Sequence, residues 1–169
     1  MKENEFDFIH LAIKSRLNKE IKEIKKLYQA TIDGDGAINF HSKCDNIPNT
    51  LVIIKSAGNR RFGGFVTYAW SSNEKKYVED KNAFLFSLDK QKIYSNNSHA
   101  IYNCKDYGPT FGGGHSIYIC SKCIQEKNSY TYEGNNNYYN FNGDSNALSE
   151  SNGSGIYIAE YEVFQIIFK

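Results

Sequence analysis

The sequence predicts one α+β domain in which helices at the amino-terminal end are followed by strands. The strands are expected to form an antiparallel α+β or a sandwich arrangement. Apolar residues recur at helical spacing in the first part of the chain, whereas five later segments show the continuous or alternating apolar pattern of strands. The chain contains thirteen tyrosines and eleven phenylalanines but one tryptophan and one methionine, and such aromatic side chains suit pleated sheets. Its 169 residues are enough for one domain with a substantial core and short for two.

The first predicted element is an amphipathic helix from about Phe6 to Tyr28. Its apolar stripe recurs at spacings of three and four residues and consists of Ile9, Ile13, Leu17, Ile21, Ile24 and Tyr28. The rest of its surface is largely basic. We interpret this as a solvated helix face, and the alternative is a surface for an acidic partner, with Lys22 and Lys25 as candidates. The chain is therefore divided into an amino-terminal amphipathic helix, residues 1–26, and a main domain, residues 27–169.

The following elements are a second helix and the strands. Two glycines in Asp33-Gly-Asp-Gly36 end the first helix, and a short helix is expected near Ala37 to Cys44. The predicted strands are residues 51–54, 63–70, 82–88, 116–120 and 156–168, the last with a bend or bulge and in a central position. Residues 121–155 are rich in Asn, Gly, Ser and Tyr, and we expect long loops around one or two edge strands there.

Several segments, taken in order, resemble the TLDc domain family. They are Leu27-Tyr-Gln-Ala30 with Asp33-Gly34, Phe40-His-Ser-Lys-Cys-Asp45, Leu51-Val-Ile-Ile-Lys-Ser56, Phe62-Gly-Gly-Phe65 with Trp70, Asn82-Ala-Phe-Leu-Phe-Ser-Leu88, Tyr107-Gly-Pro-Thr-Phe-Gly-Gly-Gly-His115 and Ile158-Ala-Glu-Tyr-Glu-Val-Phe-Gln-Ile166. The segment that ends at His115 resembles the most distinctive part of the family. Together they span about residues 27–168, nearly the whole chain. Ser116 departs from the pattern, because an acidic residue usually follows the histidine.

The resemblance implies two antiparallel β-sheets packed face to face as a sandwich, with flanking helices. Members of the family are associated with resistance to oxidative stress, and several bind the vacuolar proton-pumping ATPase and regulate assembly of its soluble sector. The family has no agreed set of catalytic residues. We therefore expect a non-catalytic protein-interaction module without a cofactor, whose partner is the ATPase soluble sector or another large complex. The alternatives are a scaffolding subunit of a large assembly and a thiol-based peroxide scavenger.

Two glutamates and two arginines are candidates for a binding surface. Glu160 and Glu162 fall on one face of the last predicted strand, with apolar residues further along that face. Two carboxylates at this spacing could act as acid and base across a cleft. They could instead pair with a backbone amide or with Arg60 or Arg61 and close one end of the sandwich, or organise a binding surface. The sequence leaves these roles open.

The spacing Cys120-Ser-Lys-Cys123 is typical of zinc or redox sites. Further zinc ligands would come from Cys44, Cys104, His41 or His115, whereas a thioredoxin-like βαβ context is missing. Ordinary thiols, packed or exposed, are the interpretation that we favour. A Cys44–His41 nucleophile pair is a further alternative, and His115, in register with Ile117 and Ile119, is expected to face the interior.

Composition and charge exclude several classes of function. The formal net charge of +1 gives no reason to expect a nucleic-acid partner. The start of the chain lacks the apolar run of a secretory signal, and no stretch approaches the roughly 20 apolar residues needed to cross a bilayer. We therefore expect a cytoplasmic protein with reduced thiols, held at most on an organelle surface by a partner. The glycine-rich residues 108–114 lack the Gly-Lys-Ser/Thr ending of a phosphate-binding loop, so we interpret them as a close backbone approach or a bulge.

Overall fold

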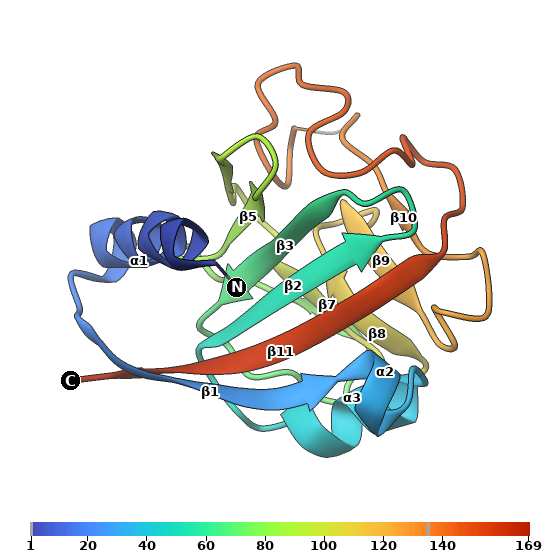
Figure 1. Cartoon of the computed structure of the whole chain (residues 1–169), viewed down its shortest axis with the longest axis horizontal. Coiled ribbons are helices and arrows are strands. Elements are labelled where there is room, and N and C mark those ends of the chain that lie inside the picture. The colour runs from blue at the N-terminus through green and yellow to red at the C-terminus, as the bar shows by residue number, and fades with distance from the viewer. Residues whose placement is uncertain (1, 135) are drawn as a thin grey trace.

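The computed structural model describes residues 2–134 and 136–169, and two antiparallel sheets account for most of its regular structure (Figure 1). Over these residues the larger sheet has six strands in the order β1-β11-β2-β3-β5-β6, and the smaller has five in the order β10-β9-β8-β7-β4. The larger sheet comprises β1 (Ile21–Gln29), β2 (Thr50–Ser56), β3 (Arg61–Val66), β5 (Phe84–Ser87), β6 (Lys92–Ser95) and β11 (Ile158–Phe168). The smaller sheet comprises β4 (Lys76–Val78), β7 (Ile101–Asn103), β8 (Tyr107–Phe111), β9 (Ile117–Cys120) and β10 (Tyr130–Thr131). The predicted α+β sandwich is confirmed.

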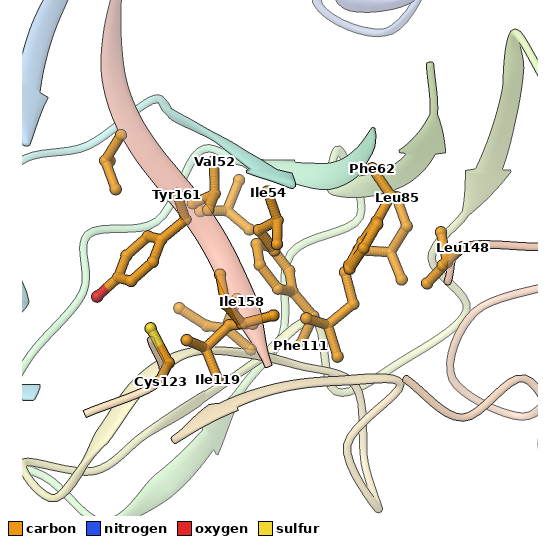
Figure 2. Packing of buried hydrophobic residues seen from close by; sticks show 14 of the residues in the cluster. Val52, Ile54, Phe62, Leu85, Phe111, Ile119, Cys123, Leu148, Ile158 and Tyr161 are labelled. Carbon is orange, nitrogen blue, oxygen red and sulfur yellow. The ribbon is translucent and has the colours of Figure 1, made fainter. Parts of the chain in front are cut away.

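The main core lies between the two sheets (Figure 2). Side chains alternate across a strand, so β2 points Val52 and Ile54 into this core and Leu51 and Ile53 to the opposite face of the sheet. Aromatic and aliphatic residues from both sheets fill the space, among them Phe62, Leu85, Phe111, Ile119, Ile158 and Tyr161. Burial of these side chains on the inner faces is what holds the two sheets together.

Helix α1 (Glu3–Leu17) covers the outer face of the larger sheet, opposite the smaller sheet. Ile9 and Ile13 are buried there in a second apolar cluster, formed with Leu51, Ile53, Phe65, Phe84, Phe86, Leu88 and Ile166. The Arg16 guanidinium lies 4.6 Å from the centroid of the Phe84 ring. The amino-terminal helix therefore packs on its own domain. Burying one isoleucine completely contributes about 1.5–3 kcal/mol.

The predicted helix over residues 6–28 is wrong in its second half. Helix α1 ends at Leu17, the capping residue Asn18 takes a left-handed φ of 49°, and β1 follows, paired antiparallel with β11. A β-bulge explains the misleading pattern. The register shifts directly after Ile21, and the extra residue lets Ile21 and Ile24 face the same side three positions apart, as they would on a helix.

The other predicted elements agree with the structure except at their ends. The helices α2 (Ala30–Asp33) and α3 (Ala37–Cys44) follow β1, and α3 coincides with the predicted second helix. The strand expected over residues 63–70 ends at Val66, and Trp70 forms an isolated bridge with Asp45. Strand β11 lies between β1 and β2 and has the expected irregularity, a register shift after Ile158. Across residues 2–134 and 136–169, none of the helices has the length and apolar character that a bilayer crossing requires.

Candidate functional site

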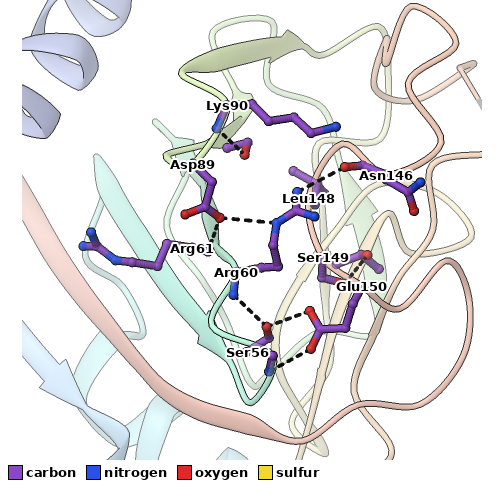
Figure 3. A network of polar contacts seen from close by, with 12 residues as sticks. Ser56, Arg60, Arg61, Asp89, Lys90, Asn146, Leu148, Ser149 and Glu150 are labelled. Carbon is purple, nitrogen blue, oxygen red and sulfur yellow. Dashed lines mark hydrogen bonds and ion pairs between the residues drawn. The ribbon is translucent and has the colours of Figure 1, made fainter.

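The predicted arginines hold elements of the fold together. The Arg60 Nε donates to Asp89 at 3.3 Å and its Nη2 to the Asn146 carbonyl at 3.1 Å (Figure 3). These contacts tie the turn between β2 and β3 to two other loops. Arg61 forms an ion pair with Glu5, a residue of α1 that is only 8% exposed, and so fixes the helix to the sheet. Neither arginine is paired with the predicted glutamates.

The predicted glutamates lie together on the outer face of β11 and pair with the neighbouring strand and helix. The Glu160 carboxylate accepts a hydrogen bond from the Thr31 backbone amide at 3.1 Å and one from the Gln29 side chain at 3.0 Å. Glu162 forms an ion pair with Lys26 on β1. The expectation of a backbone-amide partner is confirmed for Glu160, whereas pairing with an arginine is wrong. Both carboxylates therefore link β11 to β1, and Glu160 also links it to α2.

The predicted lysines Lys22 and Lys25 lie on β1 at the free edge of the larger sheet. Both are exposed, and within the described residues neither forms an ion pair or a hydrogen bond through its side chain. They belong to a strand and not to the helix face on which the sequence placed them. The two lysines thus share one sheet edge. Arg60 and Arg61 lie elsewhere, at the end of the turn between β2 and β3 and at the start of β3.

The outer face of the smaller sheet carries a row of tyrosines that the sequence does not reveal. Each strand contributes one ring, and in sheet order they are Tyr130, Tyr118, Tyr107, Tyr102 and Tyr77. We call this set the tyrosine row. Successive ring centroids lie 5.3, 4.8, 6.0 and 4.7 Å apart, so every ring contacts the next. The row therefore forms one continuous aromatic strip across the whole sheet.

His115 lies beside the middle of the tyrosine row. Its ring stacks on Tyr118 with a centroid distance of 5.9 Å and contacts Tyr102 at 5.3 Å. Burial lowers the pKa of His115, which favours the neutral ring, although the nearby Gly112 backbone opposes this. The expectation that His115 faces the interior is wrong, because its φ of 64° places it in a turn before β9 and interrupts the alternation.

The tyrosine row is neutral and keeps its polar groups available. Burial raises the pKa of Tyr118 to about 12, so its hydroxyl stays protonated at physiological pH. The hydroxyls of Tyr102, Tyr107, Tyr118 and Tyr130 make no hydrogen bond with the described part of the chain. Charged residues lie at the margin of the row, where Lys76 pairs with Glu74 at 2.9 Å and His99 with Glu79 at 3.2 Å. An aromatic centre with a charged rim is the usual anatomy of a protein interface.

The family model of the TLDc domain matches residues 1–167 of the chain. The chain belongs to the TLDc domain family. The match includes α1 and β1, and β1 is one continuous strand across the predicted division between residues 1–26 and 27–169. The TLDc domain thus extends over the predicted amino-terminal helix as well. No curated protein sequence matches the chain.

The glycine-rich segment that resembles the TLDc family forms β8 and the turn that follows it. Residues 107–111 form β8, and Gly112 and Gly114 take positive φ values of 82° and 72° in the turn to β9. A Cβ on Gly113 would come within 2.3 Å of the Tyr138 ring, so a glycine is needed for that ring to pack there. The predicted close approach at these glycines is confirmed, with a side-chain ring as the neighbour.

The thiols of this TLDc domain are packed into its interior. All four cysteines are free and buried, and Cys123 lies in the core near Ile119 and Ile158 (Figure 2). Burial raises the pKa of Cys123 and of Cys44 far above that of an ordinary thiol. Within residues 2–134 and 136–169, no three His, Cys, Asp or Glu side chains are grouped so that they could hold a metal ion. The geometry therefore favours packed thiols.

His41 is committed to structural hydrogen bonds. Its Nδ1 lies 2.6 Å from an Asp45 carboxylate oxygen, and its Nε2 donates towards the carbonyls of Cys104 and Tyr107 at 2.9 and 3.0 Å. Both ring nitrogens are thus occupied, and the Cys44 thiol has no exposed surface. A Cys44–His41 nucleophile pair gains no support from this arrangement. The histidine links α3 to the start of β8.

Proposed function

We propose that this TLDc domain is a non-catalytic protein-interaction module of the cytoplasm. It regulates the vacuolar proton-pumping ATPase through the pump's soluble sector, or acts as a protection factor against oxidative stress. Membership of the TLDc family supports this choice of process, because both activities are associated with the family. The partner is a protein in either case.

The tyrosine row is the observation that carries the proposal. Tyrosine is enriched at the centres of protein interfaces, because its ring gives a large contact area and its hydroxyl a hydrogen-bonding group. Five such rings touch one another on one sheet face, and Tyr77 at its end is 38% exposed. The free hydroxyls of the other four would exchange water for polar groups of a partner. The packed thiols, in contrast, do not support the peroxide-scavenging alternative.

Recovery of partners from the native cell tests this proposal. The tagged chain is gently crosslinked, purified and analysed by mass spectrometry, beside the double variant Tyr102→Ser/Tyr118→Ser. Tyr157→Ser is the matched control, because Tyr157 is exposed but lies outside the row. We expect soluble-sector ATPase subunits with the unmodified chain and the control, and a loss of at least about tenfold with the double variant.

Other outcomes would contradict the proposal in different ways. Stoichiometric recovery of a different, permanent complex would favour the scaffolding alternative. A solitary monomer would remove the regulator interpretation altogether. Peroxide consumption that is lost on Cys123→Ser would establish the thiol enzyme instead.

A further inference from the structure

Strand β1 leaves one edge of the larger sheet open. It pairs antiparallel with β11 on one side, and in the described residues no strand pairs with its other side. Such an edge presents unpaired backbone N–H and C=O groups to the surroundings. At the far end of β1 the Gln29 amide is already satisfied by Asp33 at 2.8 Å, so the open part runs from about Ile21 to Leu27.

A cleft runs beside this open edge, between β1 and α1. Its volume is about 470 Å³, and Phe6 from the helix and Ile21 and Ile24 from the strand line it, all three half-buried. Charged residues form its rim, namely Lys2, Glu3, Lys22 and Glu23. The cleft therefore offers an apolar site for one or two side chains directly next to unpaired backbone groups.

The charge along the edge is unbalanced. Lys26 is neutralised by Glu162. Lys19, Lys22 and Lys25, by contrast, have no ion pair in the described residues, against two unpaired carboxylates beside the edge, those of Glu23 and Glu3. An edge with three unpaired lysines repels basic segments and discourages unselective pairing of neutral ones. It attracts an acidic segment from a distance.

We propose that β1 binds an acidic, extended segment of a partner protein by strand addition. Such a segment hydrogen-bonds to the open edge of β1 between Ile21 and Leu27. Its apolar side chains enter the cleft against Phe6 and Ile24, while alternate carboxylates contact Lys22 and Lys25. Main-chain pairing supplies affinity in this mode of recognition, and the side-chain positions supply selectivity. The surface is separate from the tyrosine row, which lies on the other sheet.

A designed peptide tests the proposal on the full chain. The probe is a fluorescein-labelled peptide in which glutamate and valine alternate, and its binding is followed by fluorescence anisotropy. We expect saturable binding that weakens as salt is added. Lys22→Glu/Lys25→Glu should weaken it by at least about tenfold. The matched control Lys81→Glu/Lys127→Glu makes the same charge change at exposed residues outside the edge and should stay within about twofold.

Two further measurements separate strand addition from simple charge attraction. The same peptide with alternate backbone nitrogens methylated keeps its charge but loses half of its donors, and we expect it not to bind. In heteronuclear NMR spectra, the unmethylated peptide should shift the amide signals of β1. The variant Tyr102→Ser/Tyr118→Ser should bind the peptide normally, so this test and the test of the tyrosine row can fail independently.

Three results would overturn the proposal. Equal binding of the methylated peptide would show that only charge is recognised. Equal binding to Lys22→Glu/Lys25→Glu would place the peptide elsewhere. Dimers in sedimentation velocity that dissociate in the lysine variant, without peptide binding, would assign the edge to a second copy of this chain.

Discussion

The two sheets share one core but differ on their outer faces. The outer face of the larger sheet carries Leu51, Ile53, Phe65, Phe84 and Phe86, all buried by helix α1. The outer face of the smaller sheet carries the tyrosine row, and the described residues place no helix over it. Both faces are rich in aromatic rings. They differ in the kind of ring, because the rings of the first face are phenylalanines, whereas those of the second face are tyrosines, each with a hydroxyl group.

This difference shows how the two outer faces of one sandwich can have different roles. Phenylalanine gives no polar group to satisfy, so it suits a face that a helix of the same chain removes from water. Tyrosine buries most of its ring against its neighbours and still offers a polar edge to water or to a partner. The covered face thus contributes to stability within the chain, and the uncovered face stays available for an interaction.

The largest expected effect is on the covered face. Ile13→Ala should lower the free energy of unfolding by about 2–5 kcal/mol, because Ile13 is fully buried between α1 and the sheet. Leu11→Ala is the control, since Leu11 is 68% exposed on the same helix and should change stability by less than about 0.5 kcal/mol. Urea unfolding followed by circular dichroism measures both. Equal effects would mean that α1 is not part of the folded core.

The next effect concerns the ion pair that holds α1 on the covered face. Burial opposes ionisation of Glu5, but hydrogen bonds from the Lys2 backbone amide and from Arg61 lower its pKa below the ordinary value of 4.5. A pKa lowered by folding gives stability that is present above the unfolded value and is lost as the pH falls through the folded value. We therefore expect Glu5→Gln to cost about 1–2 kcal/mol at neutral pH and little in acid.

Unfolding free energies measured between neutral pH and about pH 3 test this sign. Glu3→Gln is the control, because Glu3 is exposed and unpaired in the described residues. If the difference between Glu5→Gln and the unmodified chain grew as the pH fell, the ion pair would not be what holds the helix.

The smallest expected effect is the loss of stability when a single tyrosine hydroxyl is removed, and it should differ between the core and the uncovered face. The buried Tyr139 hydroxyl donates to the Ala100 carbonyl at 2.8 Å, so Tyr139→Phe should cost about 1 kcal/mol. The Tyr118 hydroxyl has no partner in the described chain, and Tyr118→Phe should change stability by less than about 0.5 kcal/mol. Thermal unfolding by calorimetry compares them. A larger loss for Tyr118→Phe would show that the row serves the fold and not a partner.

The local pattern of apolar residues was sufficient to predict an element wherever its type did not depend on distant segments of the chain. Helix α3 follows from the glycine before Ala37 and the apolar face formed with Phe40 and Cys44, and β11 from its long apolar run. Both were predicted with the correct type. The α+β class follows from the same signals, because the periods of apolar residues differ between helices and strands.

The local pattern failed to predict β1, because the spacing of its apolar residues fits both a helix and a bulged strand. Ile21 and Ile24 suit a helical stripe and a bulged strand equally well. Pairing with β11, more than 130 residues further along the chain, decides for the strand. The partners of Glu160 were also undetermined, because Gln29 and Thr31 lie 131 and 129 residues before it in the chain.

The sequence by itself therefore determined the TLDc family, the two-layer architecture and the packed character of most apolar residues. The tertiary structure alone decided where the candidate surfaces lie. The tyrosine row joins residues from Tyr77 to Tyr130, and it exists because the strand order places five separated segments side by side. The open edge of β1 exists because a distant strand pairs with it on one side and leaves the other free. Apolar period is a local property of the chain, whereas a shared surface depends on contacts between distant segments, which no local pattern encodes.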